Sequence, residues 1–236
     1  MAEPAMIASV AVDIDIVWRR VSTDPSLAEV LDDRERERAA RRGNPARYTT
    51  AHALLRTAVA EQVGGTPQAV VFERTCATCG SHRHGKPTVA GHPELSVSLS
   101  YAGGLAVVAL SRGGEVGVDV EVVDDSDFEG FNAVTLDPSE APALDRLGPD
   151  RLGVARALVW ARKEAVLKAS GHGLAVDPRQ VVVSGPEEPA ALLQWKGDVA
   201  LSTGVQLADV PLTEPGHVAA VALLSDQPAQ VRLVSA

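Results

Sequence analysis

Residues 117–121 read Gly-Val-Asp-Val-Glu, where small apolar and acidic side chains alternate. Successive side chains of a strand point to opposite faces, so a strand here places Asp119 and Glu121 on one face and the valines on the other. Two carboxylates on one face repel each other, and a hard cation such as Mg²⁺ bound by their oxygens removes that conflict. Taken alone, the motif also fits a half-exposed edge strand whose acids are solvated.

A second polar motif lies in residues 160–168, which read Trp-Ala-Arg-Lys-Glu-Ala-Val-Leu-Lys. Apolar residues recur through this segment at intervals of three and four, and Gly171 follows, which predicts a helix that ends at a glycine. Glu164 and Lys168 share one face of such a helix. A metal-binding acid and a phosphate-binding amine would then be neighbours, although an ordinary surface Glu–Lys pair has the same spacing.

The segments around the first motif predict strands. Residues 95–100, 105–111 and 116–123 are short runs rich in Val and Leu, separated by glycine pairs that suit hairpin turns. We expect a three-stranded antiparallel meander. Residues 124–149 are acidic and contain prolines, so we expect a linker or mobile loop there.

Two segments of the chain are similar in sequence. Residues 104–111 (Gly-Leu-Ala-Val-Val-Ala-Leu-Ser) resemble residues 216–225 (Gly-His-Val-Ala-Ala-Val-Ala-Leu-Leu-Ser), and a further strand-like run follows each. Coincidence is one explanation, because apolar strands resemble one another easily. The other is a duplicated α+β unit, which suits the length and predicts a ligand site in a cleft between the halves.

Composition narrows the class of protein. A length of 236 residues allows one large domain or two fused halves, and the net charge of −9 argues against nonspecific nucleic-acid binding. No apolar run reaches the roughly 18 residues that a membrane span requires. The first residues show no basic start or cleavage site of a secretory signal. We expect a mature, soluble, cytoplasmic protein.

The two motifs occur here in the order and at the separation of a known family. The chain resembles the 4′-phosphopantetheinyl transferases, and in particular their longer, surfactin-synthetase-activating type. The resemblance extends to Gly85-Lys86-Pro87 and covers roughly residues 31–175. It implies an α+β fold of two similar halves related by a pseudo-twofold axis, each with a small antiparallel sheet and a long helix. Residues 1–112 would form the half on the adenosine side of coenzyme A, and residues 113–236 the half with the metal site.

The resemblance also implies a reaction. Members of the family transfer the 4′-phosphopantetheine arm of coenzyme A to a serine of an apo acyl or peptidyl carrier protein and release adenosine 3′,5′-bisphosphate. The carboxylates matching Asp119, Glu121 and Glu164 bind Mg²⁺ in that family. Lys168 would contact the diphosphate, and Glu164 would orient or deprotonate the incoming serine. Metal and lysines would neutralise the anionic oxygens, as phosphoryl transfer requires.

Further residues match donor-binding positions of the family. Lys86 and Pro87 match a loop along the adenosine end of coenzyme A, Ser100 matches a phosphate-contacting serine, and Lys163 precedes the signature glutamate. The family usually has a histidine after that serine, whereas this chain has Tyr101. A phenol donates one hydrogen bond but carries no positive charge near neutral pH. We expect altered, not abolished, activity.

The charge-dense residues 32–47 and the following residues 48–63 predict two helices that are separated by a break at 43–45. The arginines in this region match a basic segment that reaches the 3′-phosphate and adenosine in the family, and Arg47 and Arg56 are the candidates. A solvated charged helix would have the same composition.

The expected partner is an apo carrier protein from fatty-acid, polyketide or nonribosomal peptide synthesis, and the sequence does not choose among these. Such carriers are typically acidic and so is this chain, so docking should rely on apolar contact and a local basic patch. The family's docking surface follows the signature helix, which places it near residues 169–200. A monomer is the default state for the longer type.

A separate cluster allows a different interpretation. Cys76, Cys79, His82 and His84 offer two thiols and two imidazoles, the ligand types that zinc prefers, although the spacing is tighter than in structural zinc sites with two separated knuckles. A redox Cys-x-x-Cys is a weaker interpretation, because no strand and helix of thioredoxin type flank it.

Three hypotheses therefore remain at the level of sequence. The first is the transferase. The second is a catalytically silent coenzyme A-binding protein of the same fold, which Tyr101 would suit but which has no need of all the acidic motif residues and Lys168. The third is a zinc-binding interaction module.

Overall fold

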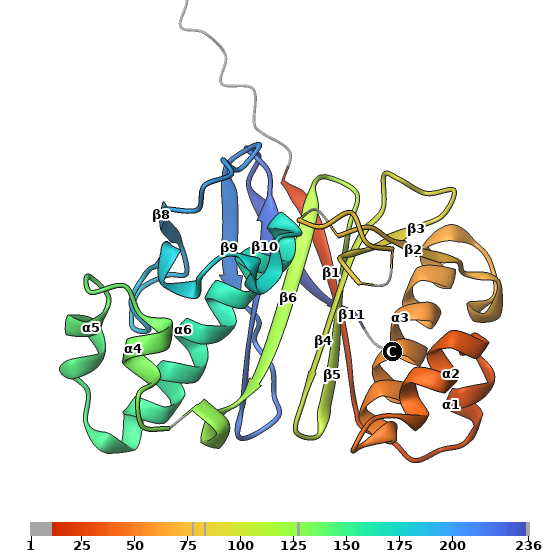
Figure 1. Cartoon of the computed structure of the whole chain (residues 1–236), viewed down its shortest axis with the longest axis horizontal. Coiled ribbons are helices and arrows are strands. Elements are labelled where there is room, and N and C mark those ends of the chain that lie inside the picture. The colour runs from red at the N-terminus through yellow and green to blue at the C-terminus, as the bar shows by residue number, and fades with distance from the viewer. Residues whose placement is uncertain (1–10, 77, 83, 127, 235–236) are drawn as a thin grey trace, which may run out of the picture.

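The computed structural model describes residues 11–76, 78–82, 84–126 and 128–234 and shows a mixed α+β fold, which confirms the predicted class. Its long helices, α3 (Pro45–Val63) and α6 (Pro149–Ser170), lie on opposite sides of the strands (Figure 1). Residues 1–10, which bear on the expected mature N-terminus, lie outside the described residues. Within the described ranges, no helix is both long and apolar enough to cross a membrane.

The first sheet has six strands in the order β11-β1-β5-β4-β3-β2. They are β1 (Val12–Arg20), β2 (Phe72–Arg74), β3 (Pro87–Val89), β4 (Ser96–Ala102), β5 (Leu105–Ser111) and β11 (Ala229–Val234). β1 and β11 pair in parallel, and the other neighbours are antiparallel. Helices α1 (Ser26–Glu29) and α2 (Asp33–Ala40) precede α3, and a 3₁₀ helix (Pro67–Ala69) follows it.

The predicted break between the two N-terminal helices is present. Asp32 caps α2 by accepting a hydrogen bond from the backbone N–H of Glu35, whose side chain accepts from Asp32 in return. The side chain of Asn44 caps α3 by accepting a hydrogen bond from the backbone N–H of Arg47, and Pro45 stands in the first turn of the helix. α3 therefore begins as a separate helix at Pro45, after α2 has ended at Ala40.

The second sheet has three strands in the order β6-β10-β9, and a two-stranded sheet pairs β7 with β8. These strands are β6 (Glu115–Val122), β7 (Val181–Val183), β8 (Leu192–Trp195), β9 (Val205–Asp209) and β10 (His217–Leu224). Between β6 and α6 lie a 3₁₀ helix (Val123–Ser126), α4 (Phe131–Thr135) and α5 (Ala141–Asp145). The 3₁₀ helices Gly173–Ala175 and Pro178–Gln180 follow α6.

The core has three parts because the strands alternate their faces. One cluster packs α3 against the first sheet, and another packs α6 against β10 and β7. The third lies between the two sheets and includes Val116, Val118 and Val120 from β6. The intervening positions of β6, among them Asp119, are therefore left to face α6, as the alternating sequence predicts.

The predicted meander is wrong in one pairing. β4 and β5 pair as expected, but β6 leaves that sheet and pairs antiparallel with β10. The hydroxyls of Ser96 and Ser98 on β4 accept hydrogen bonds from the backbone N–H groups of Val116 and Val118, both at 3.0 Å. β6 thus runs beside β4 through side-chain bonds, and its backbone remains free to pair with a strand from the end of the chain.

The expected linker at 124–149 is also wrong, because this segment folds into short helices whose Phe131 and Leu144 are buried in the α6 cluster. The hydrophobic residues of this acidic segment, which show no clear period in the sequence, find a core to join only in the tertiary structure.

The two parts of the chain have corresponding strand orders in space, β1-β5-β4 and β6-β10-β9. In the sequence of each part, a long helix (α3 or α6) follows the first of these strands and precedes the other two. The two similar segments, residues 104–111 and 216–225, contain β5 and β10, which are the central strands of the two three-strand groups. However, β11 from the end of the chain joins the first sheet beside β1. The pseudo-twofold axis and the boundary between residues 112 and 113 stay predictions.

Candidate functional site

The site is built where β6 contacts α6. Gly117 lies so close to the helix that a Cβ there would stand 2.1 Å from the carbonyl oxygen of Ala165 and 2.3 Å from the nitrogen of Ala169. Only glycine permits this backbone-to-backbone approach. The close contact brings the polar face of β6 against Glu164 and Lys168 of α6.

Asp119 forms the centre of the site and is 3% exposed. Its Oδ1 accepts hydrogen bonds from Lys168 Nζ at 2.6 Å and from Ser100 Oγ at 2.8 Å, while Lys168 also donates to Ser100 Oγ at 3.0 Å. The structure thus brings together three predicted residues from β4, β6 and α6, far apart in the sequence.

The neighbouring carboxylates are incompletely satisfied. Asp119 Oδ2 and Glu164 Oε1 are buried and have no hydrogen-bond partner within the described part of the chain. Glu121 Oε1 accepts a hydrogen bond from Trp160 Nε1 at 2.9 Å. Buried oxygens of this kind cost free energy unless a donor or a cation meets them.

The electrostatics of the site disfavour so many negative charges. Burial, followed by repulsion from Asp119, raises the pKa of Glu121 to about 8 and the pKa of Glu164 to about 7. A hard divalent cation would relieve both effects, because carboxylate oxygens are its preferred ligands. The donor set fits such an ion, although Glu121 is turned toward Trp160 and the three carboxylates do not form a compact group of ligand atoms.

Two adjoining cavities open next to this cluster. The first, of about 520 Å³, is lined by Lys168, by the loop with Lys86 and Pro87, and by the turn after α6 that contains Leu174. The second, of about 670 Å³, shares Arg74 and other lining residues with the first. Its wall is strongly basic and includes Arg38, Arg41, Arg42 and Arg74. Together they form a groove suited to an anionic ligand larger than a single phosphate.

The predicted residues of the Gly-Lys-Pro loop lie at this groove. Lys86 Nζ is 2.6 Å from Glu115 Oε2 and donates to the carbonyl oxygen of Ala169 at 3.3 Å, so it connects the loop to both β6 and α6. Burial lowers the pKa of Lys86. Pro87 is buried at the start of β3. Tyr101 is half-buried and lines the second cavity.

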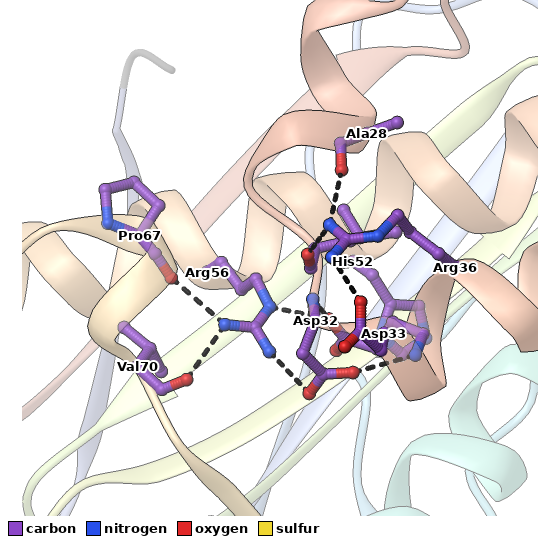
Figure 2. Close-up of polar contacts among 10 residues, drawn as sticks. Ala28, Asp32, Asp33, Arg36, His52, Arg56, Pro67 and Val70 are labelled. Atoms are coloured by element: carbon purple, nitrogen blue, oxygen red, sulfur yellow. Dashed lines mark hydrogen bonds and ion pairs between the residues drawn. The ribbon is translucent and has the colours of Figure 1, made fainter.

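Arg56 lies elsewhere, in a buried network within the N-terminal helices (Figure 2). Its guanidinium bonds to Glu35 at 2.6 Å, to Asp32 at 2.9 Å, and to the carbonyl oxygens of Pro67 and Val70. These acceptors belong to three different segments of the chain, so Arg56 connects α2 and α3 to the segment that follows α3. Arg56 lines neither cavity.

Lys163 is likewise directed away from the acidic cluster. It is 0% exposed and donates to Glu140 Oε2 and to the carbonyl oxygen of Val181, both at 2.6 Å. Glu140 in turn accepts from the backbone N–H groups of Asp137 and Val183. Lys163 and Glu140 therefore anchor α6 to α5 and β7. Arg47 is exposed at the start of α3 and lines neither cavity.

The arginines that line the groove are not the candidates Arg47 and Arg56, whose roles toward a ligand stay predictions. Arg38, Arg41 and Arg42 line the second cavity, and Arg74 lines both. The dense charge of residues 32–47 could have indicated that Arg38, Arg41 and Arg42 lie at an anion site. No sequence pattern indicated Arg74, because its position at the groove depends on the pairing of β2 with β3.

Comparison with known proteins agrees with this geometry. Residues 115–222, which include Asp119, Glu121, Glu164 and Lys168, match the family model described as the 4′-phosphopantetheinyl transferase superfamily. A putative 4′-phosphopantetheinyl transferase of Synechocystis sp. is 27% identical over 194 residues, which cover 80% of this chain and 75% of the relative.

The 4′-phosphopantetheinyl transferase HetI of Nostoc sp. is 29% identical over 75% of this chain and 76% of its own length. A 4′-phosphopantetheinyl transferase of Bacillus subtilis is 26% identical over 52% of this chain and 51% of its own. This protein is a transferase enzyme. The acidic cluster of the transferase lies inside residues 115–222, the region that matches the superfamily model. The residues that line the basic second cavity precede this region in the sequence.

Proposed function

We propose that the transferase moves the 4′-phosphopantetheine arm of coenzyme A to a serine hydroxyl of an apo acyl or peptidyl carrier protein and releases adenosine 3′,5′-bisphosphate. One observation carries this proposal. The unpaired, buried oxygens of Asp119 and Glu164 lie beside Lys168, which also lines the 520 Å³ cavity. An acidic cluster and a phosphate-binding cation next to a basic groove are the components that this transfer needs.

The donor would lie along the groove. The basic wall of the second cavity suits the 3′-phosphate of coenzyme A, and the first cavity, with Lys86 and Pro87, suits its adenosine end. Lys168 and Ser100 would donate hydrogen bonds to the diphosphate. Arg47 stays a candidate for the 3′-phosphate, although it is exposed and lines neither cavity.

Asp119, Glu121 and Glu164 would hold a Mg²⁺ ion. When bound, the ion supplies charge neutralisation for the diphosphate. Glu164 is the residue that we assign to orient the incoming serine hydroxyl or accept its proton, since it is buried in the cluster with one oxygen unpaired. Tyr101, in place of the family's usual histidine, would offer a hydrogen bond without a charge, so diphosphate binding should be weaker than with an imidazolium.

We further propose that the transferase is of the longer, surfactin-synthetase-activating type and works as a monomer of two related halves. The corresponding strand orders of the two sheets support a duplicated unit. The cysteines at 76 and 79 are free thiols, which suits the expected cytoplasmic location.

The test is intact-mass analysis of an apo carrier protein incubated with the transferase, coenzyme A and Mg²⁺. We expect a gain of one phosphopantetheine arm. Glu164→Gln keeps the size of the side chain but removes its charge, and should lower the rate by about 10²-fold or more. The matched control is Glu61→Gln, an exposed glutamate on α3 that should leave the rate unchanged.

The competing hypothesis is a silent coenzyme A-binding protein. It would be supported by coenzyme A binding without any mass gain across acyl and peptidyl carriers. A mass gain that is equal for Glu164→Gln and wild type would contradict the role assigned to Glu164 and leave the transfer itself established.

A further inference from the structure

The loop between β2 and β3 holds a second polar cluster, outside the acidic site. Arg74 and Pro87 pair at the base of this hairpin, and Arg74 Nη1 donates to the carbonyl oxygen of Gly85 at 3.0 Å. Cys76 and Cys79 lie on the outgoing arm of the loop and His84 on the returning arm. The hairpin thus holds residues from its two arms opposite each other.

Their ligand atoms converge. Among the described residues, Cys76, Cys79 and His84 form a group of possible metal ligands whose ligand atoms all lie within 4.8 Å of one another. Cys79 Sγ and His84 Nε2 are 3.3 Å apart. Both thiols are free. Two thiolates and one imidazole at such distances match the donors of a tetrahedral zinc site.

The backbone of the first arm has the form of a metal-binding knuckle. The N–H of Gly80 donates to the carbonyl oxygen of Cys76 at 2.9 Å, and Gly80 has a φ of 67°, which a residue with a side chain rarely adopts. The turn brings Cys79 back toward Cys76, so that their sulfur atoms lie within 4.8 Å of each other.

A second glycine sets the position of the histidine. Gly85 has a φ of 116°, and a Cβ there would lie 2.6 Å from the carbonyl oxygen of Thr75. The backbone after His84 therefore packs directly on the backbone before Cys76. This approach, which only glycine allows, holds His84 next to the thiols.

We propose that Cys76, Cys79 and His84 bind a Zn²⁺ ion. Of the four residues that the sequence offered, His82 is left out of this set, because the group of converging ligand atoms does not include it; its Nδ1 lies 3.2 Å from both Thr75 Oγ1 and the carbonyl oxygen of Arg74. The fourth position of the ion is taken by water, since Cys79 and His84 are exposed. Binding releases the protons of the two thiols to solvent.

The site has a structural consequence for the enzyme. The zinc ligands line the 520 Å³ cavity, and the same loop continues directly into Gly85-Lys86-Pro87. An ion that joins the two arms removes conformational freedom from the loop and so holds this wall of the cavity in place. The inference does not depend on the proposed transfer reaction, because a zinc ion bound by the loop would restrict the motion of this cavity wall whatever ligand the groove binds.

The test is elemental analysis of the full-length protein as purified, with Zn²⁺ as the probe. We expect about one zinc ion per chain. Cys79→Ser and His84→Ala should each lower the zinc content at least about tenfold after dialysis, because a site with one ligand fewer binds metal much more weakly. The matched controls are His82→Ala and His92→Ala, which should retain the wild-type content.

A second readout covers the case in which a cysteine variant fails to fold. Replacement of zinc by Co²⁺ in the wild-type protein should produce a thiolate-to-cobalt charge-transfer band, and a chelator should remove the band and lower the melting temperature, with recovery on addition of Zn²⁺.

Three results would overturn the proposal. The first is that the purified protein contains no zinc and also fails to bind added Zn²⁺ or Co²⁺. The second is that a disulfide joins Cys76 to Cys79 after purification under reducing conditions. The third is that His82→Ala loses as much zinc as Cys79→Ser and His84→Ala do. The phosphopantetheinylation assay is a separate measurement, so failure of the zinc site and failure of the transfer reaction can be told apart.

Discussion

Buried basic side chains in this transferase look alike in the sequence but have different partners in the structure. Arg56 is 1% exposed and donates four hydrogen bonds to protein acceptors, and the buried Lys163 donates to Glu140 and to nearby carbonyl groups. Lys168 instead lies between an acidic cluster and a cavity. A cation that is fully buried among protein acceptors cannot reach a phosphate, whereas Lys168 lines the cavity.

Arg56→Met should therefore destabilise the protein without weakening coenzyme A binding. The substitution leaves Glu35 and Asp32 without their cation, and we expect a loss of about 3–5 kcal/mol in the free energy of unfolding, measured by urea denaturation. Arg47→Met, at an exposed position of the same helix, is the control and should change that free energy by no more than about 0.5 kcal/mol. Unchanged stability with reduced coenzyme A affinity would show that Arg56 binds ligand.

At the scale of elements, the contact between β6 and α6 determines the geometry of the site. Gly117 lets the strand touch the helix backbone, and two residues later Asp119 reaches Lys168. The strand supplies one carboxylate face and the helix the other polar groups, so any change in their separation moves the ligands of the proposed metal ion relative to one another.

Gly117→Ala should push β6 away from α6. The added methyl group would collide with backbone atoms of Ala165 and Ala169, which cannot rotate aside as a side chain can. We expect a loss of about 1–3 kcal/mol in the free energy of unfolding and a Mg²⁺-dependent activity that falls by more than stability explains. The control is Gly104→Ala, where no atom lies within 4 Å of the added group. Wild-type activity in Gly117→Ala would contradict this prediction.

At the scale of the whole molecule, residues from both parts of the chain line the groove. Exposed apolar residues outside the groove are available to contact a partner protein. In the stretch 169–200, residues 171–175 line the first cavity, so this part serves the groove. Leu193 on β8 lies beyond it and is 61% exposed. Acidic carriers should dock on an acidic enzyme mainly through such apolar contacts.

Leu193→Asp should lower the affinity for the carrier protein and leave the affinity for coenzyme A unchanged. Loss of apolar contact and repulsion from an acidic carrier act in the same direction, so we expect at least about a tenfold rise in the dissociation constant for the carrier. Calorimetry with each ligand separately measures this. Leu233→Asp, on the exposed face of β11, is the control. Equal weakening of both ligands would refute the docking surface.

The acidic cluster should also make the stability of the metal-free protein depend on pH. Glu121 and Glu164 have folded-state pKa values of about 8 and about 7, above the ordinary value of 4.5, so the folded state binds more protons than the unfolded state between those limits. Stability contributed by these groups is therefore present at low pH and lost as the pH rises through 7 and 8.

Urea denaturation without divalent cations should show a decrease of about 1–3 kcal/mol between about pH 5.5 and about pH 8.5, after allowance for solvent screening at half-buried Glu121. Mg²⁺ should restore stability at the higher pH, because it binds the folded state. Glu164→Gln removes one of the two groups and should flatten the dependence. A Glu164→Gln profile as steep as wild type would contradict this origin.

Local patterns in the sequence were sufficient for several features. The alternation at 117–121 predicted the two faces of β6, and the periodicity and Gly171 predicted α6 and its end. Each depends on neighbours within a few positions, where backbone geometry alone determines which side chains share a face. The proximity of Asp119 to Lys168 followed only from the resemblance, since spacing within the chain does not show it.

The tertiary structure was needed wherever the partner lies far along the chain. β6 pairs with β10 instead of β5, Arg56 meets Glu35, and Lys163 meets Glu140. Strand edges and buried charges accept any partner of suitable chemistry, and the sequence offers many. The packing of three hydrophobic clusters selects among them, because burial is cooperative and only one arrangement satisfies the polar groups that it encloses.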